Sequence, residues 1–266
     1  MDIESVTLVY FSPTGTTKKV LESIAETIGA KEVRTVDLTG PDTMSRTFDE
    51  IKDGLVILGS PVYSGRIPEK SAERFRRIKG NGVPVVVVVV YGNREYEDAL
   101  LELRDIAVEQ GFKPVAGGVF IGEHSFSTDE TPLSVGRPDA QDIDIARDLG
   151  QKLARKMRDT VSSEDIGELT VPGSNPYRDR HRIDRAPPAT NEELCTKCLK
   201  CVEACPTAAI ACDEEIVTDP ESCIFCCACV KVCPNKARSF DNSVVNWIRA
   251  WLSKDYGKRK EPELFI

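Results

Sequence analysis

The sequence predicts a doubly wound parallel α/β sheet over residues 1–158, followed near the C-terminus by a small cysteine-rich α+β domain. Two observations carry this prediction. Five short strand-like segments alternate with segments of helical periodicity, as in parallel sheets whose strands are joined by crossover helices. Further along, two cysteine runs are each followed by proline, and every cysteine of the first run recurs 28 positions later, from Cys195 to Cys223. A chain of 266 residues has room for one ordinary domain and one small one.

The fourth expected strand has the clearest composition, because it consists of valine up to its final tyrosine. Such a run is typical of a central parallel strand buried on both faces. Ligands of a doubly wound sheet bind beyond the carboxyl ends of the strands, so the loops at those ends are the ones to examine. The expected strands are Val6–Phe11, Glu32–Leu38, Leu55–Ser60, Val85–Tyr91 and Val115–Ile121, and the expected helices are Thr17–Ile28, Glu69–Ile78, Tyr96–Gln110 and Ala140–Met157.

The loop after the first strand, Ser12–Thr17, is rich in hydroxyl groups, contains one glycine and opens a helix. Backbone N–H groups at a helix N-terminus, together with Ser and Thr hydroxyls, bind phosphate without a charged side chain. A strand–helix turn with a hydroxyl cap is the alternative interpretation. Neither a Walker loop nor the glycine-rich dinucleotide fingerprint is present, so direct use of a nicotinamide cofactor is disfavoured.

Two further loops each place an aromatic residue, a glycine and polar groups at a strand end. They are Ser60–Pro68 and Tyr91–Tyr96. With Ser12–Thr17, they could hold a phosphate and a flat ring. His124 follows the fifth strand on the same side of the sheet. It is either a proton donor to a bound ring or substrate, or a hydrogen-bonded loop or docking residue.

Both cysteine runs read C-x2-C-x2-C-x3-C-P, the pattern of bacterial proteins that hold two iron–sulfur clusters. In this pattern three cysteines of a run bind one cluster and the fourth binds the other. Structural zinc favours two pairs across a longer loop, and disulfide frameworks belong to secreted chains, so both are disfavoured. We expect Cys212 and Cys227 to be small buried residues instead. The pattern assigns Cys195, Cys198, Cys201 and Cys233 to cluster one, and Cys223, Cys226, Cys229 and Cys205 to cluster two.

The S-x-T-G-x-T sequence of Ser12–Thr17 resembles the phosphate loop of flavodoxins, and the next two loops stand where that family binds the isoalloxazine ring of FMN. The whole chain, including the YGNR segment at Tyr91–Arg94, resembles the flavodoxin–ferredoxin fusion proteins of anaerobic bacteria and archaea. The resemblance implies a flavodoxin-like five-stranded sheet of order 2-1-3-4-5 and a small two-[4Fe-4S] ferredoxin-like domain. The third-strand loop lacks the tryptophan and acidic cluster common in free flavodoxins, which implies a different redox partner or shifted flavin potentials.

By the same resemblance the cofactors are FMN and two [4Fe-4S] clusters, with Tyr63 and Tyr96 as the candidates for stacking on the ring. The alternative for both tyrosines is ordinary core packing. The FMN contacts that the resemblance implies are Ser12, Thr14, Gly15, Thr16, Thr17, Ser60, Pro61, Val62, Tyr63, Tyr91, Gly92, Asn93 and Tyr96.

The expected organisation is an FMN-binding domain over residues 1–158, a linker over 159–190, a cluster domain over 191–241, and a C-terminal helix and tail over 242–266. Four linker arginines are expected either to lie against the acidic cluster segment or to be solvated, namely Arg178, Arg180, Arg182 and Arg185. The apolar stripe of the C-terminal helix is expected to pack on its own protein, with a membrane surface as the alternative.

The leading functional interpretation is an electron-transfer protein that connects the clusters, FMN and a soluble partner, either a ferredoxin or an oxidoreductase. The alternatives are a ferredoxin-dependent reductase acting on a small molecule at FMN, and a redox sensor. A net charge of −8 and the lack of a basic domain argue against nucleic acid. No signal peptide or membrane span is expected, and oxygen-sensitive clusters indicate the cytoplasm of an anaerobe. The sequence does not distinguish a monomer from a homo-oligomer.

Overall fold

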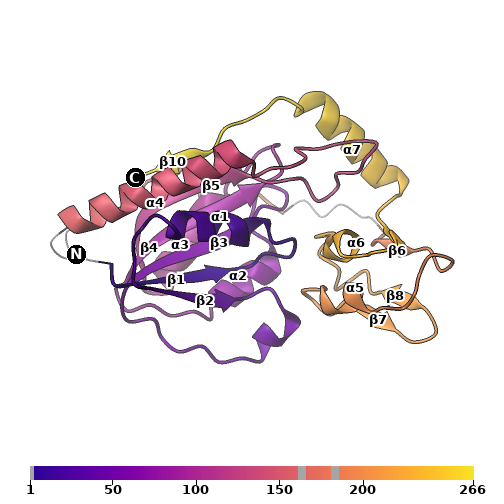
Figure 1. Cartoon of the computed structure of the whole chain (residues 1–266), viewed down its shortest axis with the longest axis horizontal. Helices are drawn as coiled ribbons and strands as arrows, with labels where there is room; N and C mark the ends of the chain where they lie inside the picture. Colours follow the sequence, from indigo (N-terminus) through magenta and orange to yellow (C-terminus); the bar gives the residue numbers. More distant parts are fainter. Residues whose placement is uncertain (1–2, 161–165, 181–185) are drawn as a thin grey trace.

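The structure is a computed structural model that describes residues 3–160, 166–180 and 186–266. Its larger part is a six-stranded sheet of order β10-β5-β4-β3-β1-β2 (Figure 1). The five parallel strands coincide with the predicted ones and confirm the 2-1-3-4-5 order, which is that of flavodoxin-like folds. They are β1 (Ser5–Tyr10), β2 (Glu32–Asp37), β3 (Leu55–Pro61), β4 (Pro84–Tyr91) and β5 (Lys113–Ile121).

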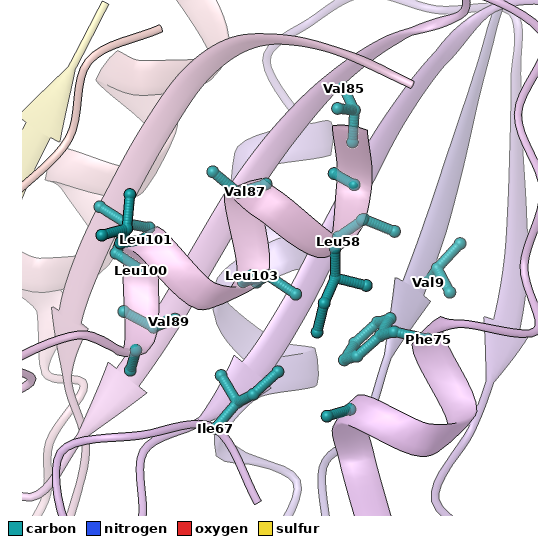
Figure 2. Close-up of a cluster of buried hydrophobic side chains, with 14 of the residues drawn as sticks. Val9, Leu58, Ile67, Phe75, Val85, Val87, Val89, Leu100, Leu101 and Leu103 are labelled. Atoms are coloured by element: carbon teal, nitrogen blue, oxygen red, sulfur yellow. The ribbon is translucent and has the colours of Figure 1, made fainter. Parts of the chain in front are cut away.

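Helices cover both faces of this sheet, α2 and α3 on one face and α1 and α4 on the other. The valines of β4 alternate between the two faces: Val87 packs with α2 and α3 (Figure 2), whereas Val88 packs with α1 and α4. Each such fully buried side chain stabilises the fold by roughly 1.5–3 kcal/mol. The helices are α1 (Thr16–Ala25), α2 (Glu69–Phe75), α3 (Ala99–Glu109) and α4 (Ala140–Asp159), with a short 3₁₀ turn at η1 (Pro41–Met44).

The cysteine-rich part consists of two short helices and two antiparallel strand pairs, β6 with β9 and β7 with β8. The 28-residue repeat extends to the backbone, because left-handed residues recur at the same spacing, as at Lys197 and Phe225 and at Leu199 and Cys227. These residues turn the chain between successive cysteines. The elements are β6 (Ala189–Thr190), α5 (Lys200–Glu203), β7 (Ile210–Cys212), β8 (Ile216–Thr218), α6 (Ala228–Lys231) and β9 (Arg238–Ser239).

The last helix, α7 (Ser243–Asp255), packs on its own protein, as expected, and not as a free amphipathic surface. Val245, Ile248 and Leu252 are buried against Phe126 of the sheet domain and Phe240 of the cysteine-rich part. Among the described residues, none of the helices is long and apolar enough to cross a bilayer.

Residues 256–266, which we call the strap, return from α7 to the sheet and end in a sixth strand, β10 (Glu263–Phe265) (Figure 1). This strand pairs antiparallel with β5, an addition that the sequence analysis did not anticipate. Asn93 fixes the middle of the strap: its Nδ2 donates to the carbonyl oxygens of Tyr256 (2.7 Å) and Lys258 (2.8 Å), and its Oδ1 accepts from the Lys260 N–H.

The described part of the linker lies on the sheet domain. The N–H groups of Ser174 and Arg178 donate to the Asp98 carboxylate, and the Arg180 guanidinium donates to Glu102. The expectation that the linker arginines are solvated or face the cluster segment is therefore wrong for Arg180, which is half-buried, whereas Arg178 is 54% exposed to solvent and also pairs with Glu97 of the sheet domain. The other two, Arg182 and Arg185, lie outside the described residues.

Replacing Asn93 by glycine should loosen the strap. Asn93 has a left-handed backbone with φ of 68°, so glycine removes its side-chain bonds without adding strain. Loss of these bonds should raise hydrogen exchange of residues 257–265 by about tenfold or more, measured by mass spectrometry. Asn81→Gly, in an exposed turn, is the matched control. Equal exchange in Asn93→Gly and wild type would show that β10 alone holds the strap.

Candidate functional site

A cavity lies beyond the carboxyl ends of the parallel strands, where the doubly wound fold places ligands. Its walls come from both parts of the chain, because Ile224 and Phe225 of the second cysteine run and Trp251 of α7 border it. The sheet domain contributes the loops after β1, β3, β4 and β5. The predicted site residues that line it are Ser12, Thr14, Thr16, Thr17, Pro61, Val62, Tyr63, Tyr91 and Gly92.

The loop after β1 has the geometry of an anion site without a charged side chain. Gly15 has φ of 77° and stands directly before α1, a conformation that favours glycine. The Ser12 Oγ accepts from the Lys18 N–H (3.1 Å), which holds the loop closed. Within the described residues, no backbone carbonyl accepts a hydrogen bond from the N–H groups of Thr16 and Thr17 at the start of α1. The hydroxyls of Thr14 and Thr16 lie 3.3 Å apart beside them.

Four predicted residues do not line the cavity, namely Gly15, which shapes the loop before α1, and Ser60, Asn93 and Tyr96. The buried Ser60 hydroxyl bonds to that of Ser71 (2.8 Å), and Asn93 binds the strap. The Tyr96 hydroxyl donates to Glu263 of β10 (3.0 Å), and its ring is part of the apolar core. Of the two stacking candidates, only Tyr63 therefore lines the cavity.

Tyr63 lines the cavity near the cysteines of the second run. Burial raises the pKa of its hydroxyl well above the usual value, and the thiolates of Cys226 and Cys227 raise it further. The hydroxyl is thus a neutral group at the boundary between the two parts. The aromatic residues Phe225 and Trp251 also line the cavity and were not anticipated, because only the tertiary arrangement places them here.

His124 also lines the cavity. Its Nδ1 accepts from the Phe126 N–H (3.0 Å), so a neutral ring carries its proton on Nε2. Gly92 lies against this ring: a Cβ there would come within 2.3 Å of the imidazole Cδ2. Glycine at this position therefore allows the histidine to pack beside the cavity.

Two smaller cavities lie inside the cysteine-rich part, and each is bordered by one of the predicted quartets. The fourth cysteine of each run reaches the cavity of the other run, as the C-P pattern requires. The Ala209 and Ala237 N–H groups donate at 3.2 Å to the Sγ atoms of Cys205 and Cys233. Within the described chain, no three or more His, Cys, Asp or Glu side chains are arranged to hold a single metal ion.

The two quartets differ in exposure. Cys198 of the first quartet is exposed, whereas Cys205, Cys226 and Cys229 of the second are buried. Burial raises the pKa of Cys226 to about 12. The side chain of Cys227 also borders the second cavity but packs in the apolar cluster with Phe126 and Phe240.

Cys212 is half-buried at the end of β7 and borders neither cysteine cavity. It was expected to be buried.

Comparison with known proteins agrees with this division of the chain. A model of the 4Fe-4S binding domain matches residues 188–211 and 216–239. The chain joins a flavodoxin-like fold to a ferredoxin-type 4Fe-4S domain. No curated protein matches the sequence significantly.

Similar solved structures include three flavodoxins. An archaeal flavodoxin is 17% identical over 58% of this chain and 99% of its own, with a TM-score of 0.37. Flavodoxin 1 from Bacillus cereus is 15% identical over 57% and 97%, with a TM-score of 0.39. A Fusobacterium nucleatum flavodoxin bound to flavin mononucleotide is 15% identical over 59% and 98%, with a TM-score of 0.37. At these low scores, the strand order and not these matches identifies the fold.

Polar contacts fix the 4Fe-4S domain against the flavodoxin-like domain. Lys231 pairs with Glu123 and Lys236 with Asp129. The most buried contact is made by Arg74 of α2, which is 2% exposed. Its guanidinium donates to the carbonyl oxygens of Leu38 (2.7 Å), Thr39 (2.7 Å) and, across the boundary, Pro206 (2.6 Å).

Replacing Arg74 by methionine should destabilise the protein and loosen the 4Fe-4S domain. The change leaves buried carbonyl groups without a donor, which costs roughly 1–3 kcal/mol. At about 2–4 °C per kcal/mol, the thermal midpoint should fall by several degrees. The control is Arg76→Met at the C-terminal end of α2, which removes an exposed ion pair with Glu109 of α3 and should change stability by less than about 0.5 kcal/mol. Equal midpoints for the two variants would contradict the role of Arg74.

Proposed function

We propose that this protein transfers electrons between FMN and an external redox partner through two [4Fe-4S] clusters. One observation carries the proposal: Ile224 and Phe225 border the same cavity as Tyr63 and the hydroxyl-rich loop. These two residues stand between Cys223 and Cys226, two ligands of cluster two in the proposed assignment. A bound flavin would therefore be separated from that cluster by little more than one segment of chain.

The residues of the cavity fit FMN. The phosphate would accept hydrogen bonds from the N–H groups and hydroxyls at the start of α1, around Thr14 and Thr16. The ring would lie among apolar and aromatic walls, with Tyr63, Phe225 and Trp251 excluding water. FMN supplies one- or two-electron chemistry, and each cluster supplies one-electron chemistry. Together, FMN and the clusters would pass electrons between two-electron and one-electron redox partners.

The proposed order is FMN, then cluster two, then cluster one. The cluster-two quartet is mostly buried next to the flavin cavity, whereas Cys198 of the cluster-one quartet is exposed. Leu194 and Leu199 border the cluster-one cavity and are 48% and 41% exposed. An external redox partner would therefore approach cluster one.

The side chains that cover the proposed flavin cavity favour an electron carrier over a reductase that acts on a small molecule. Side chains from the 4Fe-4S domain and from Ile248, Trp251 and Leu252 of α7 form its walls on the side away from the sheet. The cavity faces the cysteine-rich part, as electron exchange within the chain requires.

The cofactor assignment predicts about eight irons and one FMN per chain after anaerobic purification. Cys198→Ser should reduce the iron content to about four, because it removes a ligand of cluster one alone. Cys227→Ala is the matched control and should retain about eight, because its thiol packs among apolar side chains. Iron and acid-labile sulfide analysis with EPR spectroscopy checks both numbers. Zinc in place of iron, or equal iron loss in the two variants, would refute the assignment.

The phosphate site predicts a selective loss of FMN affinity when its hydroxyls are removed. Thr14→Val and Thr16→Val should each weaken FMN binding about tenfold or more, the usual effect of losing a hydrogen bond to a charged group. Quenching of FMN fluorescence by the flavin-free protein measures the dissociation constant. Thr35→Val, in the exposed face of β2, should leave it unchanged. Unchanged affinity in both loop variants would mean that the phosphate binds elsewhere.

A further inference from the structure

Arg238 of β9 is a buried cation at the centre of the 4Fe-4S domain, with only 3% of its surface exposed. Two of its guanidinium nitrogens donate to the hydroxyls of Thr190 and Thr218, both at 2.7 Å. The second of these nitrogens also lies 3.6 Å from the Sγ of Cys229. Its Nε has no hydrogen-bond partner within the described residues.

No carboxylate of the described residues forms an ion pair with Arg238. A buried guanidinium without an anion is strongly unfavourable, since the charge has left water without compensation. The internal repeat shows that the fold does not need a cation at this position, because the equivalent residue, 28 positions earlier, is Ile210. An arginine in place of a buried isoleucine therefore indicates that something anionic compensates its charge.

Arg238 contacts both cysteine quartets. It borders the cavity formed by Cys195, Cys198, Cys201 and Cys233, and it donates toward Cys229 of the other quartet. Four thiolates give each bound cluster a net negative charge, which grows by one when the cluster accepts an electron. A cation between the two sites therefore stabilises each reduced state relative to the oxidised one.

We propose that Arg238 is a positioning residue shared by the two clusters, and that its charge raises the reduction potentials of both. The effect is larger on cluster two, where the guanidinium also donates to a ligand sulfur. This inference rests on the cluster assignment of the proposed function. It adds that one side chain, placed where the repeat has an apolar residue, adjusts both redox centres together.

The test compares Arg238→Gln and Arg238→Lys with wild type by anaerobic redox titration followed by EPR, after iron content has been measured. Removal of the charge in Arg238→Gln should shift the reduction equilibrium of cluster two by about tenfold, or about 59 mV to lower potential. Cluster one should shift in the same direction by less. Arg238→Lys, which keeps the charge, should restore most of the wild-type potential.

The control is Lys236→Gln, which removes an 85% exposed cation from the same domain, where solvent and salt screen the charge. Wild-type reduction potentials in Arg238→Gln would overturn the proposal. A potential shift in Lys236→Gln or in Arg238→Lys as large as that in Arg238→Gln would also overturn it. If Arg238→Gln binds no iron, Arg238→Lys decides: near-wild-type potentials support the role of the charge. Loss of iron from both variants would make Arg238 a purely structural residue. Wild-type protein without iron would instead refute the proposed function itself.

Discussion

The contact between the 4Fe-4S domain and the carboxyl ends of the parallel strands determines how the rest of the chain is arranged. Strand ends in a doubly wound sheet leave loop backbone and apolar side chains uncovered, and a ligand cavity forms there. In this chain a second domain supplies the missing wall through Ile224 and Phe225. The linker, α7 and the strap then all serve to hold that domain in place, since each of them bonds to the sheet domain.

The strap explains why the second domain is positioned so firmly. The strap is held at its end by the pairing of β10 with β5 and in its middle by the hydrogen bonds of Asn93. Movement of α7 away from the sheet would therefore break the strand pairing and these hydrogen bonds. Arg74 adds a contact from the opposite side, through Pro206 directly after Cys205. The 4Fe-4S domain is thus connected to the sheet on two sides, and neither connection is a flexible tether. The proposed electron path between FMN and the clusters needs such a fixed separation.

Local sequence patterns predicted most of the fold but little of how the 4Fe-4S domain packs against the flavodoxin-like domain. The five parallel strands were predictable because runs such as the six valines of β4 have only one environment that suits them. The cysteine quartets followed from spacing alone. The strap could not be predicted, because three residues of β10 pair with β5 more than a hundred residues earlier and carry no periodicity of their own. Asn93 and Tyr96 were assigned to the ring because they lie in the right loop, yet position along a loop does not fix where a side chain points.

The internal repeat makes the two cysteine quartets alike, and the departures from it make them different. Leu199 is exposed, whereas its repeat partner Cys227 is buried under α7. Cys198 is exposed, whereas its partner Cys226 is buried directly after Ile224 and Phe225, which border the cavity at the strand ends. Where the first half has Ile210, the second has the cation Arg238. In the proposed function, a symmetric pair of clusters would give electron transfer no preferred direction. Because the flavodoxin-like domain covers one half only, the second quartet becomes an inner site and the first an outer site, whereas Arg238 lies between the two.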